Sequence, residues 1–109
     1  MELQDATTAL AALSQATRLA IFRHLVAAGP DGKPAGALAS ALKVPAPTLS
    51  FHLKELERAG LVTQRRISRS IIYAADYAAM KALLSFLMAD CCGGRPEICD
   101  IDIKSCCAA

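Results

Sequence analysis

Apolar residues recur at helical spacing along most of the chain, and this pattern predicts five helices. Leu3, Ala6, Leu10 and Leu13 repeat every three to four residues, as the core-facing side of a helix does. Loop-forming glycines and prolines interrupt the pattern at Gly29–Gly32 and Val44–Pro47. The predicted helices span about 3–13, 14–28, 34–42, 47–59 and 76–92, with Ser14 capping the second and Gly60 closing the fourth.

Residues 61–75 depart from this pattern. Leu61–Thr63 and Ser70–Tyr73 are rich in β-forming residues and flank a polar tip, which is typical of a hairpin. The order of four helices, a hairpin and a fifth helix predicts a mainly α fold with one β-hairpin.

The third and fourth predicted helices are separated by a short break, as in a helix-turn-helix. Leucines 49, 53 and 56 form one stripe on the fourth helix and are expected to be buried. Pro47, Phe51, Lys54 and Arg58 fall on the opposite face, with Thr48 and Ser50 beside it. Recognition helices present such a face to base edges in the major groove, although an ordinary amphipathic surface helix has the same pattern.

Three arginines, Arg65, Arg66 and Arg69, gather at the hairpin tip. Beside a recognition helix they fit a wing that grips DNA phosphates, although a solvated turn is the simpler interpretation. His52 lies near the edge of the leucine stripe, and either a structural histidine or a DNA contact fits that position. The candidate DNA-binding residues are therefore Thr48, Ser50, Phe51, His52, Lys54, Arg58, Arg65, Arg66 and Arg69.

The 109-residue length fits one domain, and 54% hydrophobic residues with 20% charged ones indicate a packed core. No apolar run is long enough to span a membrane and no secretory signal is visible, so we expect a cytoplasmic protein. Residues 1–89 carry ten Lys or Arg against six Asp or Glu, whereas residues 90–109 carry two against four. A cationic body thus precedes an acidic tail.

All five cysteines lie in that tail: Cys91, Cys92, Cys99, Cys106 and Cys107. In the cytosol they are expected to be thiols. The glycines and proline after Cys92 let the chain turn back, so that Cys99 can approach the pair. Three sulfurs without a nearby histidine do not match the four-ligand pattern of structural zinc sites, and thiolate-only sites favour thiophilic ions. Trivalent arsenic or antimony fits best, because its lone pair leaves a three-sulfur pyramid.

Several short segments together resemble the ArsR/SmtB family of metal-responsive bacterial repressors. These segments are Thr17–Leu19, Leu49–Lys54 and Ala59–Val62, followed by an arginine-rich hairpin that ends in Tyr73. The resemblance covers roughly residues 10–92 and implies a winged-helix homodimer held by its first and last helices. It also implies that ligand binding lowers operator affinity, that Ser50, Phe51 and His52 face DNA, and that Arg69 is the wing arginine. The glycine that often precedes this arginine in the family is Ser68 here.

The same resemblance narrows the choice of ligand. Many arsenic-sensing members carry Cys-x-Cys near the start of the third helix, where this chain has no thiol between Gly36 and Ser40. Zinc-sensing members place Asp and His ligands on the last helix, where no histidine follows Asp76. Other arsenic-responsive members carry a Cys-Cys pair and a third cysteine at the end of the fifth helix, and Cys91, Cys92 and Cys99 resemble these.

The sequence therefore predicts a non-enzymatic, arsenic-responsive transcriptional repressor that binds double-stranded operator DNA as a homodimer, without an organic cofactor. Residues 1–92 would form the winged-helix DNA-binding and dimerisation domain, and residues 93–109 a flexible tail. Cys91, Cys92 and Cys99 would bind As(III) or Sb(III), and Cys106 and Cys107 are possible additional ligands. A heptad-like stripe of Tyr77, Met80, Leu84 and Leu87 supports pairing of the last helix with its twin, although a monomer core has a similar pattern. A sensor of cadmium, lead, mercury or redox state using the same thiols is the alternative.

Overall fold

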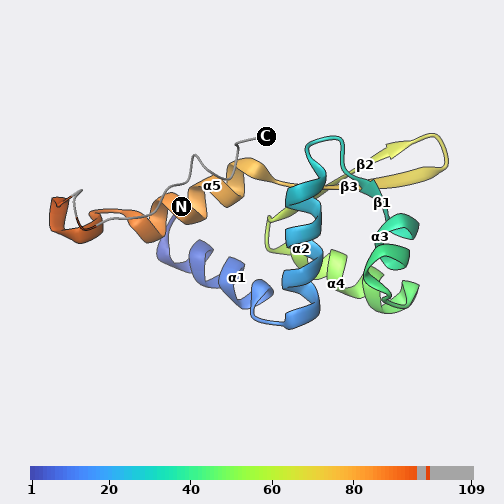
Figure 1. Ribbon diagram of the computed structural model, residues 1–109, viewed down its shortest axis with the longest axis horizontal. Helices are drawn as coiled ribbons and strands as arrows, with labels where there is room; N and C mark the ends of the chain where they lie inside the picture. Colours follow the sequence, from blue (N-terminus) through green and yellow to red (C-terminus); the bar gives the residue numbers. More distant parts are fainter. Residues whose placement is uncertain (96–97, 99–109) are drawn as a thin grey trace.

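The computed structural model describes residues 1–95 and 98, which form a helical body with a β-hairpin wing (Figure 1). The elements in chain order are α1 (Leu3–Leu13), α2 (Ala16–Ala28), β1 (Lys33–Pro34), α3 (Ala35–Leu42), α4 (Ala46–Arg58), β2 (Val62–Ile67), β3 (Ser70–Ala75), α5 (Tyr77–Met88) and the 3-10 turn η1 (Cys91–Gly94). The predicted winged helix-turn-helix is confirmed. No helix in the described part of the chain is long and apolar enough to cross a membrane.

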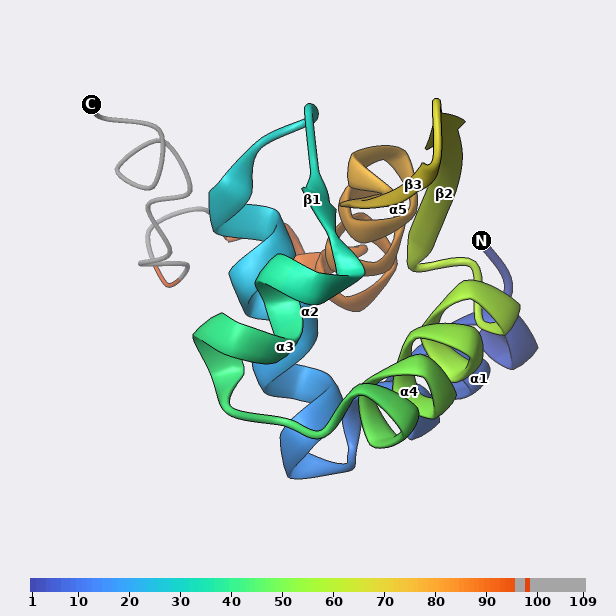
Figure 2. The same cartoon turned by 90° about the vertical axis from the view of Figure 1, so that its right-hand side faces the viewer.

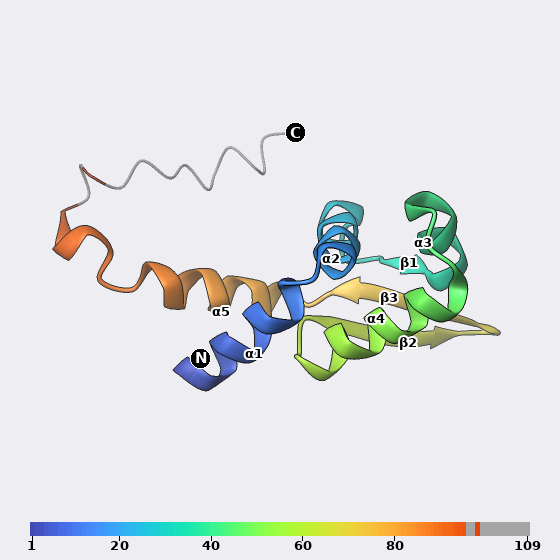
Figure 3. The same ribbon diagram turned by 90° about the horizontal axis from the view of Figure 1, so that it is seen from below.

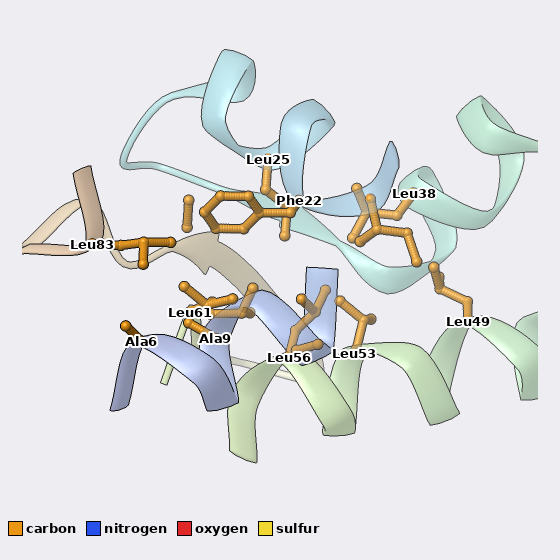
Figure 4. Packing of buried hydrophobic residues seen from close by; sticks show 14 residues of the cluster. Ala6, Ala9, Phe22, Leu25, Leu38, Leu49, Leu53, Leu56, Leu61 and Leu83 are labelled. Atoms are coloured by element: carbon orange, nitrogen blue, oxygen red, sulfur yellow. The ribbon is translucent and has the colours of Figure 1, made fainter. Parts of the chain in front are cut away.

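The core lies where α2, α3 and α4 meet above the base of the hairpin, and Figure 4 shows their side chains pointing toward one another. The leucine stripe predicted for α4 is fully buried there, which accounts for the helical spacing of these residues in the sequence. The largest side chains without exposure to solvent are Ile21, Leu25, Leu38, Leu49, Leu53, Leu56 and Leu61.

The C-terminus of α4 has the closure that the sequence predicts. Gly60 has a φ of +81°, and its N–H donates to the carbonyl of Glu57 at 3.0 Å. The next N–H, from Leu61, donates to the carbonyl of Leu56 at 3.0 Å, so the helix ends in a Schellman motif. This closure turns the chain directly from the recognition helix into the wing.

The wing is part of a three-stranded antiparallel sheet in the order β1-β3-β2. In the hairpin, Val62 pairs with Ala75 and Ile67 with Ser70, which leaves the two-residue turn Ser68–Arg69. Ser68 has a φ of +58°, in the region that glycine adopts most easily. The sequence predicts the hairpin but not β1, because Lys33 and Pro34 gain their strand character only by pairing with Tyr73 and Ile72.

Three helix boundaries differ from the sequence predictions. Gln15, not Ser14, caps α2: its side chain accepts a hydrogen bond from the N–H of Arg18 at 2.9 Å. Helix α4 starts at Ala46, one residue early. Helix α5 ends at Met88 rather than near Cys92, and Asp90 and Cys92 then adopt positive φ angles of 56° and 57°. The two cysteines therefore lie in η1, beyond the helix, and the predicted domain boundary at residue 92 falls within this turn.

Helices α1 and α5 lie together at one end of the molecule, and the wing and α3 lie at the other (Figures 1 and 3). Helix α1 turns its alanines, Ala6, Ala9 and Ala12, toward the core. Leu3 and Leu10 face outward, 69% and 42% exposed, whereas Leu13 packs against the core. The end opposite the wing thus carries an apolar surface that the described residues leave exposed, formed by Leu3, Leu10, Leu84 and Leu87.

Candidate nucleic-acid interface and thiol pair

One face of α4 is exposed beside α3, and Figure 2 shows the two helices in the angled arrangement of a helix-turn-helix. Thr48, Ser50 and Lys54 are exposed on α4, and Phe51 leaves 56% of its surface in water. A phenyl ring held in solvent while the neighbouring leucines are buried is suited to contact with a partner such as a thymine methyl group. Pro45 and Pro47 flank the first residues of α4, where missing N–H groups cost no helical hydrogen bonds.

His52 lies on the buried side of α4, with 8% of its surface exposed. Burial, and to a lesser extent the positive charge of Arg18, lower the pKa of His52, so the neutral imidazole is favoured. Its Nδ1 atom is buried and has no hydrogen-bond partner among the described residues, and its ring meets that of Phe51 edge-on at a centroid distance of 5.4 Å. The sequence left open a structural histidine or a DNA contact. The buried position supports a structural histidine that packs against Phe51.

The three wing arginines have different surroundings. Arg65 donates to the backbone carbonyls of Pro30 at 3.3 Å and Asp31 at 2.6 Å, in the loop between α2 and β1. Arg66 follows it in β2 and therefore points to the opposite face of the hairpin. Arg66 and Arg69 are exposed, and no hydrogen bond or ion pair holds either guanidinium within the described chain. These two arginines are available to a phosphate backbone, whereas Arg65 fastens the wing to the body.

Arg58 is the last residue of α4. Its Nη1 donates to Oε1 of Glu55 at 3.1 Å, an exposed ion pair of the kind that contributes little stability. Arg58 lines a cleft with residues of α1 and α2. Arg58 thus keeps the helical spacing that groups it with Phe51 and Lys54, and it also faces α1 and α2 at the end of α4.

The recognition helix and the wing meet in a second cleft of about 340 Å³. Ser50 of α4, Arg69 of the wing and the first residues of α3 line it, together with Tyr73. Burial, and secondarily the charge of Glu57, raise the pKa of Tyr73 above its usual value of 10.0, so its hydroxyl is a donor at neutral pH. Sequence reasoning did not place Tyr73 or Gly36 in the site, because only the pairing of β1 with β3 brings them to Ser50.

The thiols of Cys91 and Cys92 lie side by side in η1, with 3.2 Å between the two Sγ atoms. This is a thiol–thiol contact, longer than the disulfide bond of about 2.0 Å. No group of three His, Cys, Asp or Glu side chains suited to a metal ion occurs within residues 1–95 and 98. The other predicted ligands, Cys99, Cys106 and Cys107, lie outside the described residues.

Comparison with known proteins places this geometry among transcriptional regulators. Residues 13–65, from the end of α1 into the wing, match a family model described as a helix-turn-helix domain. No curated protein sequence matches the chain.

Among solved structures, an ArsR-like transcriptional regulator from Rhodococcus sp. RHA1 is similar with a TM-score of 0.69 and 31% identity, over 77% of this chain and 76% of that one. HlyU from Vibrio cholerae N16961 is similar with a TM-score of 0.66 and 30% identity, over 81% and 95% of the respective chains. A fragment described as the homodimeric winged helix-turn-helix DNA-binding domain of a possible ArsR-family regulator from Mycobacterium bovis has a TM-score of 0.64 and 28% identity, over 81% and 82%.

Proposed function

Because the chain belongs to the ArsR-like family of transcriptional regulators, we propose that it is a homodimeric repressor that releases its operator when C-terminal thiols bind trivalent arsenic or antimony. The observation that carries the sensing step is the contact between the thiols of Cys91 and Cys92 just after α5. The DNA-binding step is supported by the exposed face of α4 and its neighbouring wing.

On this proposal the nine candidate DNA-binding residues divide into three groups. Thr48, Ser50 and Phe51 at the start of α4 read base edges in the major groove, because the N-terminal residues of a recognition helix reach them. Lys54, Arg66 and Arg69 contact phosphates and supply affinity that depends on salt. The other three do not contact bases: His52 supports Phe51, Arg65 holds the wing, and Arg58 pairs with Glu55 at the end of α4.

Dimerisation through α1 and α5 is supported by the outward-facing leucines of these helices. A second copy of the chain would remove their apolar surface from water, which is the main favourable contribution to association. Tyr77 and Met80, which the sequence pattern grouped with Leu84 and Leu87, instead pack against the core of the same chain. The Tyr77 hydroxyl donates to the carbonyl of Val26 at 2.8 Å and so fixes α5 to α2.

The spacing of the thiols suits a soft ion. Metal–thiolate bonds are about 2.3 Å long for zinc. If two sulfurs bind one ion through bonds of about that length at about a right angle, the sulfurs lie about 3.2 Å apart. The Sγ atoms of Cys91 and Cys92 already have this separation. The metalloid would complete its pyramid with Cys99 and draw the tail toward the end of α5, next to the proposed dimer surface. Release requires only that the ligand bind the DNA-incompetent arrangement more tightly.

The test is fluorescence anisotropy of the reduced chain on its own promoter fragment, titrated with arsenite. Cys91→Ser is expected to bind the operator like the wild type but not to be released by arsenite, whereas the wild type loses about 5- to 150-fold in affinity. Arg69→Gln is the reciprocal control: it should weaken operator binding yet retain arsenite binding in equilibrium dialysis.

Parallel titrations with cadmium, zinc and peroxide distinguish a metalloid sensor from a sensor of other metals or of redox state, which would use the same two thiols. Release by peroxide but not by arsenite would make the chain a redox sensor. Release of Cys91→Ser by arsenite at the wild-type concentration would remove the site assignment.

A further inference from the structure

A cleft of about 300 Å³ opens between α1, α2 and the C-terminal end of α4. Its apolar lining is provided by Ala11, Ala12 and Ala59. Its polar lining comprises Thr8, Arg18, Glu55 and Arg58. Two guanidinium groups therefore face one carboxylate, and the cleft carries an excess positive charge.

Arg18 is the unusual member of this group. Its side chain is half-buried, and its Nε atom is buried without a hydrogen-bond partner in the described part of the chain. The one carboxylate that lines the cleft, that of Glu55, accepts from Arg58 instead. A buried donor without an acceptor costs on the order of 1–3 kcal/mol. Within residues 1–95 and 98, no carboxylate forms an ion pair with Arg18.

The chemistry of the lining selects an anion as the missing partner. Guanidinium groups bind carboxylates and phosphates through parallel, charge-assisted hydrogen bonds. The cleft is at the small end of the range for small-molecule sites, and its alanine surface suits a short apolar body behind the charged group. The Thr8 hydroxyl already donates to the carbonyl of Gln4 at 3.0 Å. Its proton is therefore not available to the anion, which leaves the two arginines as the donors.

We propose that this cleft binds a small organic anion bearing a carboxylate or phosphate group, held by Arg18 and Arg58. Neither the thiols of Cys91 and Cys92 nor the proposed base-contacting residues of α4 line the cleft, and its occupation does not depend on the metalloid response. Glu55 and Arg58 belong to α4, and a bound anion would compete with Glu55 for Arg58, about two helical turns from Phe51. An effect of the anion on operator affinity rests on the proposed DNA-binding function, whereas binding itself does not.

The test is NMR titration of the isotope-labelled, reduced full chain without DNA, with benzoate and inorganic phosphate as probes and benzamide as the uncharged match of benzoate. We expect at least one anion to shift the amide signals of Ala11, Ala12 and Ala59, and benzamide to leave them unchanged. The anion should also raise the pKa of the His52 imidazole, because it neutralises the nearby charge of Arg18.

Two variants test which residues hold the anion. Arg58→Gln, at a side chain that is 70% exposed and therefore dispensable for folding, should weaken binding about tenfold. Arg18→Lys, which keeps the charge but loses the planar fork, should weaken it further. Arg23→Gln, an exposed arginine of α2 outside the cleft, removes the same charge and should bind like the wild type. Equal losses in Arg58→Gln and Arg23→Gln, or signals that respond to neither anion, would overturn the proposal. If the chain binds the anion but does not release DNA on addition of arsenite, the anion-site proposal is supported and the metalloid-sensing proposal is not.

Discussion

The outward-facing leucines at the end opposite the wing make dimerisation quantitatively testable. Leu87 leaves 55% of its surface exposed in the single chain. Complete burial of a leucine contributes roughly 1.5–3 kcal/mol, so covering the remaining half contributes about 0.8–1.5 kcal/mol. A two-fold interface buries this residue twice. Leu87→Ala, which keeps only Cβ, should therefore weaken the dimer by about 1.5–2.5 kcal/mol, or about ten- to sixtyfold in Kd.

Sedimentation equilibrium over a range of protein concentrations measures this shift directly. Leu19→Ala is the matched control, because Leu19 is a leucine of similar exposure, 42%, that lies on α2 rather than on α1 or α5. Circular dichroism should show both variants folded. The reasoning is refuted if Leu87→Ala dimerises with the wild-type Kd, or if Leu19→Ala weakens association as much.

Two further predictions concern stability. Ser68→Gly should stabilise the chain by about 0.5 kcal/mol and raise Tm by about 2–4 °C in a thermal melt. Glycine adopts the positive φ of the wing turn without strain, although it also raises the entropy of the unfolded chain. A lower Tm would show that the serine side chain supports the turn. Burial and the Arg18 charge hold the pKa of His52 below its unfolded value of 6.5, so the unfolded chain binds the proton first as pH falls. Urea unfolding should accordingly show a free energy of unfolding that declines as pH falls through about 6.5 and levels off below the pKa of His52 in the folded chain. His52→Gln should lack this decline. An unchanged pH dependence in that variant would show that His52 is not its source.

Local sequence patterns predicted the elements that local physics determines. The bounds of α1 were predicted because its apolar spacing runs uninterrupted, and the end of α4 because Gly60 can take a positive φ. The end of α5 was wrong by four residues, since neither glycine nor proline lies between Met88 and Cys92. Asp90 supplies the break with a left-handed conformation that aspartate tolerates.

The candidate site was predicted less completely, because its details depend on contacts between distant segments. Arg65 and Arg66 are equivalent in the sequence, yet strand pairing directs only Arg65 to the loop some 35 residues before it. Periodicity placed Arg58 on the face of Phe51, but it could not show that α1 and α2 lie beside the end of α4, where Arg58 also lines a cleft. The face of α4 at Thr48, Ser50 and Phe51 was predicted, since it requires only the helix and its leucine stripe.

The loop between α2 and β1 has a composition that protein engineers would choose for inserting a tag or a fluorophore. The structure argues against that choice. Its carbonyls hold Arg65, and a side chain at Gly32 would collide with the backbone carbonyl of Tyr73 in β3. Lengthening this loop would uncouple the hairpin from the helices, so a reporter placed there would disturb the duplex contacts it was meant to monitor.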